Sequence, residues 1–306
     1  MKARIASIIA AALLFACAAG EARAAGFQIG AIGWYTWWKP SFEKWMLQGF
    51  PTTTNLPRLV KDYSFPQSPL FGPVLGIDFN DRVNLTAIFT GGKYRFRASV
   101  LTLLPFSANG AAAAHPDVSI NKYDLDTALN ITLNRFVKII IGVKYQNYSF
   151  TKTRLMSMSP TWAEYSRDSV SFNALSGGFG FGFTFRLVQN LYLIWSLSAR
   201  YQHPFIILRN NTYLLISTPV IPMRNRYMPN YNSVAGNSTL SLAYVIEAIS
   251  TTITAGFRYQ YLYTFGRDMQ DLHLSTESDH FYGVTLAAVY SYQAPEKEPL
   301  PEEKTE

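Results

Sequence analysis

The stretch from Gly177 to Phe185 has the sequence GGFGFGFTF and alternates strictly between two kinds of side chain. From Phe179 onward every second residue is Phe, and the residues between are Gly or Thr. A period of two residues is that of a β-strand whose two faces meet different surroundings. This stretch therefore predicts a strand with one aromatic face and one face of small residues.

The same design recurs along the chain. Residues 121–133, 190–203, 251–265 and 279–292 each place aliphatic and aromatic side chains on one face and small or polar ones on the other. A lipid-facing surface and a lumen would require these two faces respectively.

The amino-acid composition narrows the class of protein to which the chain can belong. Of the 306 residues 15% are charged, against roughly 25% in an ordinary soluble domain. Aromatic residues also make up 15%, yet the mean hydropathy of +0.02 is too low for a helical membrane protein. The 48% of apolar residues exclude disorder for most of the chain. An all-β, transmembrane, antiparallel up-and-down β-barrel fits all three observations.

Short and long connections alternate and set the strand number. Tight turns are expected at 80–82, 134–135, 188–190 and 249–250, and long loops at 39–71, 99–121, 152–169, 204–231 and 266–279. Nine connections give ten strands, with eight or twelve as alternatives if loops 39–71 and 204–231 hide or mimic strands. Short periplasmic turns and long extracellular loops are the outer-membrane pattern. The expected strands are 27–38, 72–80, 83–98, 121–133, 136–151, 170–187, 190–203, 232–248, 251–265 and 279–292.

The two ends of the chain differ from the barrel, which is expected over residues 25–293. Residues 1–24 have the basic start, uncharged run and Ala22-Arg23-Ala24 site of a secretory signal peptide. The chain's one cysteine, Cys17, lies inside that segment, and its lipidation is the alternative. Residues 294–306 are rich in Pro and Glu and predict a disordered periplasmic tail. Both termini of the barrel are then periplasmic.

Outward aromatic side chains are expected to form two girdles at the membrane surfaces. The girdle near the long loops would use Tyr35, Trp37, Tyr94, Phe96, Tyr145, Tyr201, Tyr261 and Tyr263, and the other girdle Phe79, Phe185, Tyr290 and Tyr292. To keep Tyr94 and Phe96 outward, the third strand needs a β-bulge near Gly91-Gly92.

In the half of the barrel near the long loops, several basic residues occupy the alternate strand positions that are expected to face the lumen. The candidate ligand-binding residues of this basic lumen are Lys93, Arg95, Arg97, Lys144, Arg200 and Arg258. Lys122 is the seventh inward basic residue at that height, and Asp124 and Asp126 are the acids. One interpretation is a site that favours anions. The other is a packed interior in which Arg95 and Arg97 pair with Asp124 and Asp126 across neighbouring strands. A second group, Lys138, Arg186, Asp78 and Glu247, would close the lower lumen.

Residues 26–293 resemble the bacterial outer-membrane β-barrel class in pattern, without a family-specific motif. Asp124-Leu125-Asp126 and Asp271-Leu272-His273 are also similar to the paired carboxylates and the Asp–His pair of omptin proteases, which are ten-stranded barrels. That resemblance implies His273 as a general base oriented by Asp271, with Asp124 and Asp126 as weaker catalytic candidates. In this chain the Asp–His pair falls in the fifth long loop, whereas omptins carry it in the fourth.

Three functions follow as hypotheses. The first is a barrel that acts through its surface loops as an adhesin, a receptor or an envelope-structural protein. The second is a narrow anion-favouring channel, and the third is a membrane-embedded hydrolase. Expected partners are outer-membrane lipids, including a lipopolysaccharide-type glycolipid, and small anions or a host or envelope partner at the loops. No nucleic acid, metal ion or cofactor is expected, because no motif for them occurs.

Overall fold

The computed structural model describes residues 26–39, 59–61, 66–97, 99–103, 111–114, 117–158, 163–215, 223–227, 230–267 and 274–292. The expected signal peptide with Cys17 and the expected tail lie outside these residues. Almost every described residue is in a strand. In chain order the elements are β1 (Gly26–Lys39), β2 (Leu59–Lys61), β3 (Gln67–Asn80), β4 (Val83–Arg97), β5 (Ser99–Leu103), β6 (Ala111–Ala114), β7 (Asp117–Thr132), β8 (Val137–Met158), β9 (Ala163–Val188), β10 (Leu191–Leu215), β11 (Met223–Tyr227), β12 (Asn230–Ile246), the 3-10 helix η1 (Glu247–Ile249), β13 (Thr251–Arg267) and β14 (Leu274–Tyr292). Within the described ranges, no helix has the length and apolar character that crossing a membrane requires.

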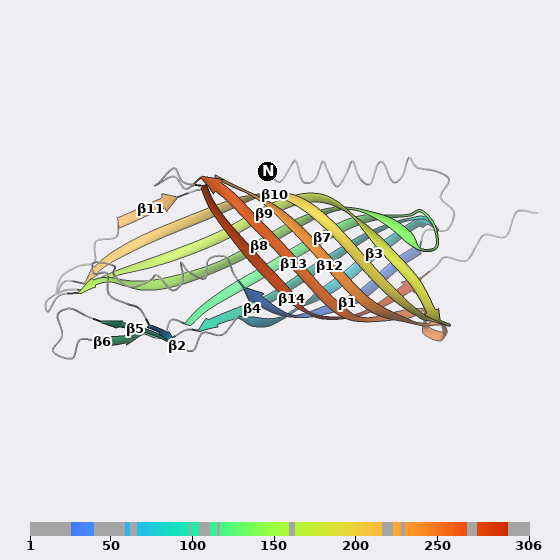
Figure 1. The fold of residues 1–306 in the computed structure, drawn as a ribbon, viewed down its shortest axis with the longest axis horizontal. Helices are drawn as coiled ribbons and strands as arrows, with labels where there is room; N and C mark the ends of the chain where they lie inside the picture. Colours follow the sequence, from blue (N-terminus) through green and yellow to red (C-terminus); the bar gives the residue numbers. More distant parts are fainter. Residues whose placement is uncertain are drawn as a thin grey trace, which may run out of the picture.

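Ten strands close into an antiparallel barrel (Figure 1). The order around it is β1, β3, β4, β7, β8, β9, β10, β12, β13 and β14, and β14 pairs back onto β1. Each barrel strand therefore neighbours the next one along the chain, and closure leaves the body of the barrel without free edges. The prediction of an up-and-down barrel of ten strands is confirmed, and the alternatives of eight and twelve strands are wrong.

Four short turns lie at one end of the barrel, which we call the short-turn end. In two of them an asparagine side chain organises the loop. Asn80 Oδ1 accepts hydrogen bonds from the backbone N–H groups of Arg82 and Val83, and Asn134 Oδ1 accepts from those of Phe136 and Val137. The side-chain carbonyl of the asparagine takes the place of a backbone carbonyl in the turn, which favours a tight connection between the strands. Both β1 and β14 also have their outer termini at this end, because Phe27 pairs with Tyr292.

Three strands run far past the opposite end, which we call the long-loop end. β8, β9 and β10 contain 22, 26 and 25 residues, against 14 in β1. A tilted strand needs only about 9–11 residues to cross a membrane. The β9–β10 ladder continues to Ala163 and Leu215, and β11 adds to β10 there. The result is a projecting sheet made of β8, β9, β10 and β11 (Figure 1, left), longer than the sequence predicted.

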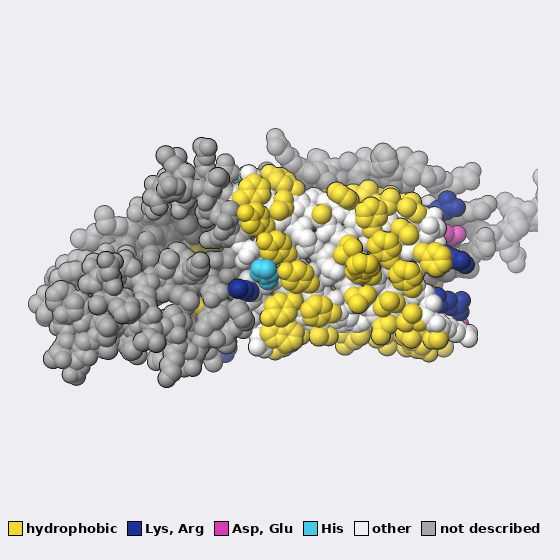
Figure 2. All heavy atoms as spheres, viewed as in Figure 1, with side chains coloured by type: hydrophobic (Ala, Val, Ile, Leu, Met, Phe, Trp, Pro, Cys, Tyr) yellow, Lys and Arg dark blue, Asp and Glu magenta, His cyan; other side chains and the backbone are white. Residues whose placement is uncertain are grey.

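The outer wall is apolar, as the alternation predicted. Figure 2 shows a broad band of hydrophobic side chains around the visible face, with basic side chains beyond it at the short-turn end. On β9 the exposed residues Phe179, Phe181 and Phe185 all point outward. Most of the aromatic residues expected in the two girdles face outward from the barrel wall. They are Tyr35, Trp37, Phe79, Tyr145, Phe185, Tyr201, Tyr261, Tyr263, Tyr290 and Tyr292.

Two expectations for β4, its bulge and the direction of its aromatic side chains, are wrong. Its ladder with β7 runs from Val83 to Arg97 without a register shift, so the expected bulge near Gly91-Gly92 does not exist. Tyr94 and Phe96 consequently point into the barrel, where both are fully buried, and they do not belong to the girdle. The irregularity instead lies in β3, between Asp78 and Asn80, where that strand enters its turn.

Candidate functional site

Inside the barrel, Asp124 on β7 binds two lysines. Its Oδ1 accepts from Lys122 Nζ at 2.5 Å, and its Oδ2 lies 3.1 Å from Lys144 Nζ on the neighbouring strand β8. All three side chains are buried. Buried charges are tolerated only when they are paired and hydrogen-bonded, and Lys144 Nζ accordingly also donates to Gln260 Oε1 at 3.1 Å.

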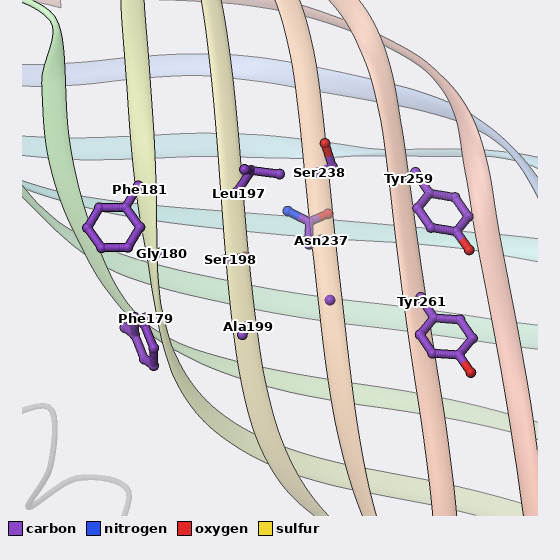
Figure 3. Close-up of a pocket in the computed structure, with 11 residues that line it drawn as sticks. Phe179, Gly180, Phe181, Leu197, Ser198, Ala199, Asn237, Ser238, Tyr259 and Tyr261 are labelled. Atoms are coloured by element: carbon purple, nitrogen blue, oxygen red, sulfur yellow. The ribbon is translucent and has the colours of Figure 1, made fainter.

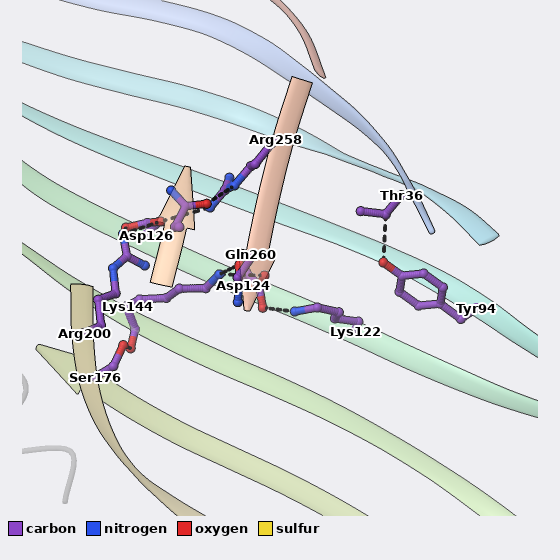
Figure 4. A network of polar contacts seen from close by, with 11 residues as sticks. Thr36, Tyr94, Lys122, Asp124, Asp126, Lys144, Ser176, Arg200, Arg258 and Gln260 are labelled. Carbon is purple, nitrogen blue, oxygen red and sulfur yellow. Dashed lines mark hydrogen bonds and ion pairs between the residues drawn. The ribbon is translucent and has the colours of Figure 1, made fainter. Parts of the chain in front are cut away.

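Asp126 on β7 binds two arginines from the other side of the lumen. Arg200 Nη2 on β10 donates to both of its oxygens, at 2.9 and 3.0 Å. Arg258 Nη2 on β13 lies 3.7 Å from Oδ2, while Arg258 Nε donates to Asn237 Oδ1 at 2.9 Å. We call Lys122, Asp124, Asp126, Lys144, Arg200 and Arg258 the lumen ion network (Figure 4). It joins four strands, β7, β8, β10 and β13, across the barrel.

Glycines on the inner face of β9 leave room for basic side chains from the adjacent strands. A Cβ atom at Gly178 would lie 2.5 Å from Cγ of Arg200, and one at Gly182 would lie 2.5 Å from Cε of Lys138. The small face that marked this strand in the sequence thus accommodates long inward side chains of its neighbours.

An aromatic layer fills the lumen on the long-loop side of this network. Trp38 on β1 contacts Tyr94, Tyr148 and Phe281, with ring centroids 5.0–5.5 Å apart. Tyr148 stacks on Phe172 at 4.3 Å. Trp38, Tyr94, Phe96, Ile120 and Phe281 have exposed fractions of 0%. This is a packed core inside the barrel.

The aromatic layer and the ion network are joined by polar and cation–π contacts. Trp38 Nε1 donates to Asp279 Oδ1 at 3.1 Å, and Tyr94 Oη and Thr36 Oγ1 are 2.8 Å apart. Lys122 Nζ lies 5.0 Å from the Phe281 ring centre, and the Arg258 guanidinium lies 4.7 Å from that of Trp34. Cations over aromatic faces are attracted by the ring quadrupole, so the layers stabilise each other.

Near the short-turn end the lumen holds Lys138 beside Gly182 and a hydrogen-bonded group around Asp78, and the expected four-residue salt-bridged group does not form there. Asp78 accepts hydrogen bonds from Gln28 Nε2 and Asn84 Nδ2, not from a lysine or arginine. Arg186 and Glu247 are exposed at the end of the barrel. The prediction that these two and Lys138 close the lower lumen together with Asp78 is wrong, because Arg186 and Glu247 do not enter it.

The basic residues predicted from parity divide into two groups. Lys144, Arg200 and Arg258 do point into the lumen and meet in one network. Lys93 and Arg95 point outward and are exposed, because β4 keeps its register and Tyr94 and Phe96 take the inner face. The expectation that these two line the lumen is therefore wrong, and so is the expected pairing of Arg95 with Asp124 or Asp126. The side chain of Arg97 lies outside the described part.

The omptin-like residues do not form one site in the described part of the chain. Asp124 and Asp126 each contact two cations, which leaves neither carboxylate free to activate a water. Asp271 and His273 lie outside the described residues. Among the described residues, no group of histidines, cysteines and carboxylates could hold a metal ion.

Sequence reasoning placed Gln260 on the inner face of its strand but named neither it nor two other members of the interior as site residues. Gln260, Asn237 and Trp34 contact the network, yet none carries the charge that directed attention to the lysines and arginines. Strand parity alone could have placed Asn237 and Trp34 inside as well. Gln146 is another buried residue of the lumen, and within the described part of the chain neither of its side-chain polar atoms has a hydrogen-bond partner.

A closed ladder, an apolar outer band and a polar, aromatic interior together define the architecture. The chain is a ten-stranded transmembrane β-barrel. No protein-family model matches its sequence, and no curated protein matches it.

A search of solved structures finds distant similarity to other outer-membrane barrels. The outer membrane protease OmpT of Escherichia coli is 11% identical with a TM-score of 0.41, and the match covers 89% of this chain and 97% of that one. The translocator domain of the autotransporter NalP of Neisseria meningitidis is 10% identical at a TM-score of 0.37, over 94% and 95%. The Pseudomonas putida toluene transporter TodX is 9% identical at 0.38, over 89% and 90%. These similarities are too low for any neighbour's activity to be assigned to this chain.

Proposed function

We propose that this chain is an outer-membrane barrel with a non-conducting lumen, which acts through its long-loop end as an adhesin, receptor or envelope-structural protein at the cell surface. The observation that carries the proposal is the aromatic layer. Trp38, Phe96 and Phe281 have no exposed surface, although they lie where a channel would need water. A barrel of about eight strands is filled by its own side chains, and ten strands lie close to that limit.

Opening such a lumen would be costly. A solute could pass only if several aromatic rings left their contacts, and truncating one buried Phe or Trp alone costs about 3–5 kcal/mol. The layer is also held by Trp38 and Asp279, which are hydrogen-bonded to each other. The interior therefore favours a rigid plug over a gate.

The projecting sheet supports recognition at the long-loop end. β8, β9 and β10 continue well beyond the length that a membrane requires. A rigid barrel that carries strands and connections outside the bilayer is a common way to present a binding surface. Both ends of the barrel sequence lie at the other, short-turn end, which we place in the periplasm.

The alternative of an anion channel draws support from one observation. In the lumen ion network four basic side chains share two carboxylates, which leaves an excess of positive charge. Buried Asp279 lies nearby and reduces that excess. The hydrolase has weaker support, because Asp124 and Asp126 are both occupied by cations.

Conductance in planar lipid bilayers tests the proposal. The refolded full chain should give no steady current, because the aromatic layer blocks the lumen. The double variant Trp38→Ala, Phe281→Ala should leak if it folds, and heat-modifiable migration on gels checks that it does. Steady, anion-selective steps from the unaltered protein would contradict the proposal and favour the channel.

A further inference from the structure

The outer wall of the barrel carries a groove of about 400 Å³ across β9, β10, β12 and β13. Small residues form its floor: Ala199 on β10 and Gly236 and Ser238 on β12. Aromatic side chains lie along its two sides, as Figure 3 shows, with Phe179 and Phe181 on β9 at one side and Tyr259 and Tyr261 on β13 at the other.

The groove is unfilled space on the outer surface of the barrel. A Cβ atom built on Gly236 would meet no heavy atom within 4 Å. The groove also belongs to the apolar outer band, which lies against the hydrocarbon of the membrane. Its occupant is therefore a membrane component, and a hydrocarbon chain matches both its position and its lining.

A polar rim adjoins the groove on the side of β13. The Tyr259 hydroxyl and His280 Nδ1 are 2.9 Å apart, and the rings of Tyr261 and His280 have centroids 4.9 Å apart. His280 pairs in turn with Lys39 on β1. Since neighbouring strands are about 4.8 Å apart, Lys39 lies about 10 Å from the groove side formed by Tyr261.

The outward surface around this rim carries only positive charge among the described side chains. At the long-loop end the outward ionic groups are Lys39, Lys93 and Arg95, and no described carboxylate faces outward there. None of the three forms an ion pair with another described side chain, in contrast to the four basic residues of the lumen ion network. Figure 2 shows a histidine and a basic side chain next to each other at the border of the apolar band.

We propose that this groove and rim bind a phosphorylated glycolipid of the outer leaflet, with one acyl chain in the groove and a phosphate at Lys39. The choice of leaflet rests on the proposed function, which places the long-loop end outside. A phosphate gains charge-assisted hydrogen bonds from a lysine ammonium and from nearby hydroxyl or imidazole donors. Tyrosines at the membrane surface supply an apolar ring for the chain and a hydroxyl for the headgroup.

Native mass spectrometry of the full chain in neutral detergent tests the site. The probe is diphosphoryl lipid A, compared with the same lipid after removal of its phosphates. The unaltered protein should retain the phosphorylated lipid. Gly236→Leu places a side chain in the groove, where a Cβ atom meets no heavy atom within 4 Å, and should weaken retention. Lys39→Gln should weaken it about tenfold by removing a charged partner.

Matched controls share the chemistry of these substitutions but not their place. Gly177→Leu also puts a side chain into open space on the outer wall, but outside the residues that line the groove. Arg186→Gln removes an exposed charge at the opposite end. Both controls should bind like the unaltered protein, and heat-modifiable migration confirms that every variant is folded.

Two results would overturn the proposal. Equal retention of the phosphate-free lipid would remove the role of Lys39, and unchanged retention by Gly236→Leu would remove the role of the groove. Neither result depends on conductance. A conducting barrel that still binds the lipid would refute the proposed function and leave this site standing.

Discussion

Asp126 is the carboxylate on which the ion network depends most, because arginines from two distant strands reach it. Arg200 and Arg258 come from β10 and β13, and they lie 2.9 and 3.7 Å from its oxygens. Removal of one partner from a buried ion pair leaves the other charge without compensation, which costs about 3–5 kcal/mol.

We expect Asp126→Asn to lower the free energy of unfolding by about that amount, 3–5 kcal/mol, in reversible urea unfolding of the protein in lipid vesicles. Asp81→Asn, in an exposed turn, should change it by less than about 0.5 kcal/mol. The double variant Asp126→Leu, Arg200→Met should recover part of the loss, because the principal cation is removed together with its partner. Similar losses for Asp126→Asn and Asp81→Asn would show that the network is not a stabilising core.

At the scale of the strand, β9 gives the cleanest test of the two faces. Phe181 is exposed on the outer wall and lines the groove, in the middle of the apolar band. Arginine facing lipid at mid-membrane costs about 2–4 kcal/mol, whereas near a membrane surface it costs about 0–1 kcal/mol.

Phe181→Arg should therefore destabilise the barrel by about 2–4 kcal/mol, and Leu187→Arg on the same face near the short turn by about 1 kcal/mol or less. The measurement is again urea unfolding in vesicles. If the two substitutions cost the same, Phe181 does not face hydrocarbon at mid-membrane.

The contrast between β9 and β4 shows which faces the sequence can predict. On β9 the outer face is Phe and the inner face is Gly, so alternation alone assigned both faces correctly. On β4 the inner face carries Tyr94 and Phe96, because this part of the lumen is an aromatic core. Hydrophobicity alone cannot distinguish a strand face that packs in an aromatic lumen from one that contacts lipid. Lys93 and Arg95 can point outward because long basic side chains reach the membrane surface.

At the scale of the whole molecule, the sequence predicted the strand number, the short turns and four of the basic lumen residues, Lys122, Lys144, Arg200 and Arg258. It did not predict the length of β8, β9 and β10, because strands outside the membrane lose the lipid contrast that made the others visible. It also did not predict how Lys144, Arg200 and Arg258 share two carboxylates. That arrangement depends on closure of the barrel, which brings β7 opposite β10 and β13.

If aromatic and ion-paired side chains fill the lumen, a single thiol placed inside it should be shielded from reagents in water. Cys17 is the one native cysteine, so Ser176→Cys in the lumen and Gln189→Cys in an exposed turn can be labelled singly in chain 25–306. The reagent is methanethiosulfonate ethylsulfonate, which is small, water-soluble and anionic. We predict that the thiol at position 176 reacts about 100-fold or more slowly than the one at 189, because it needs a local opening of the barrel. Equal rates would show a lumen that water and anions enter freely, and would contradict the account.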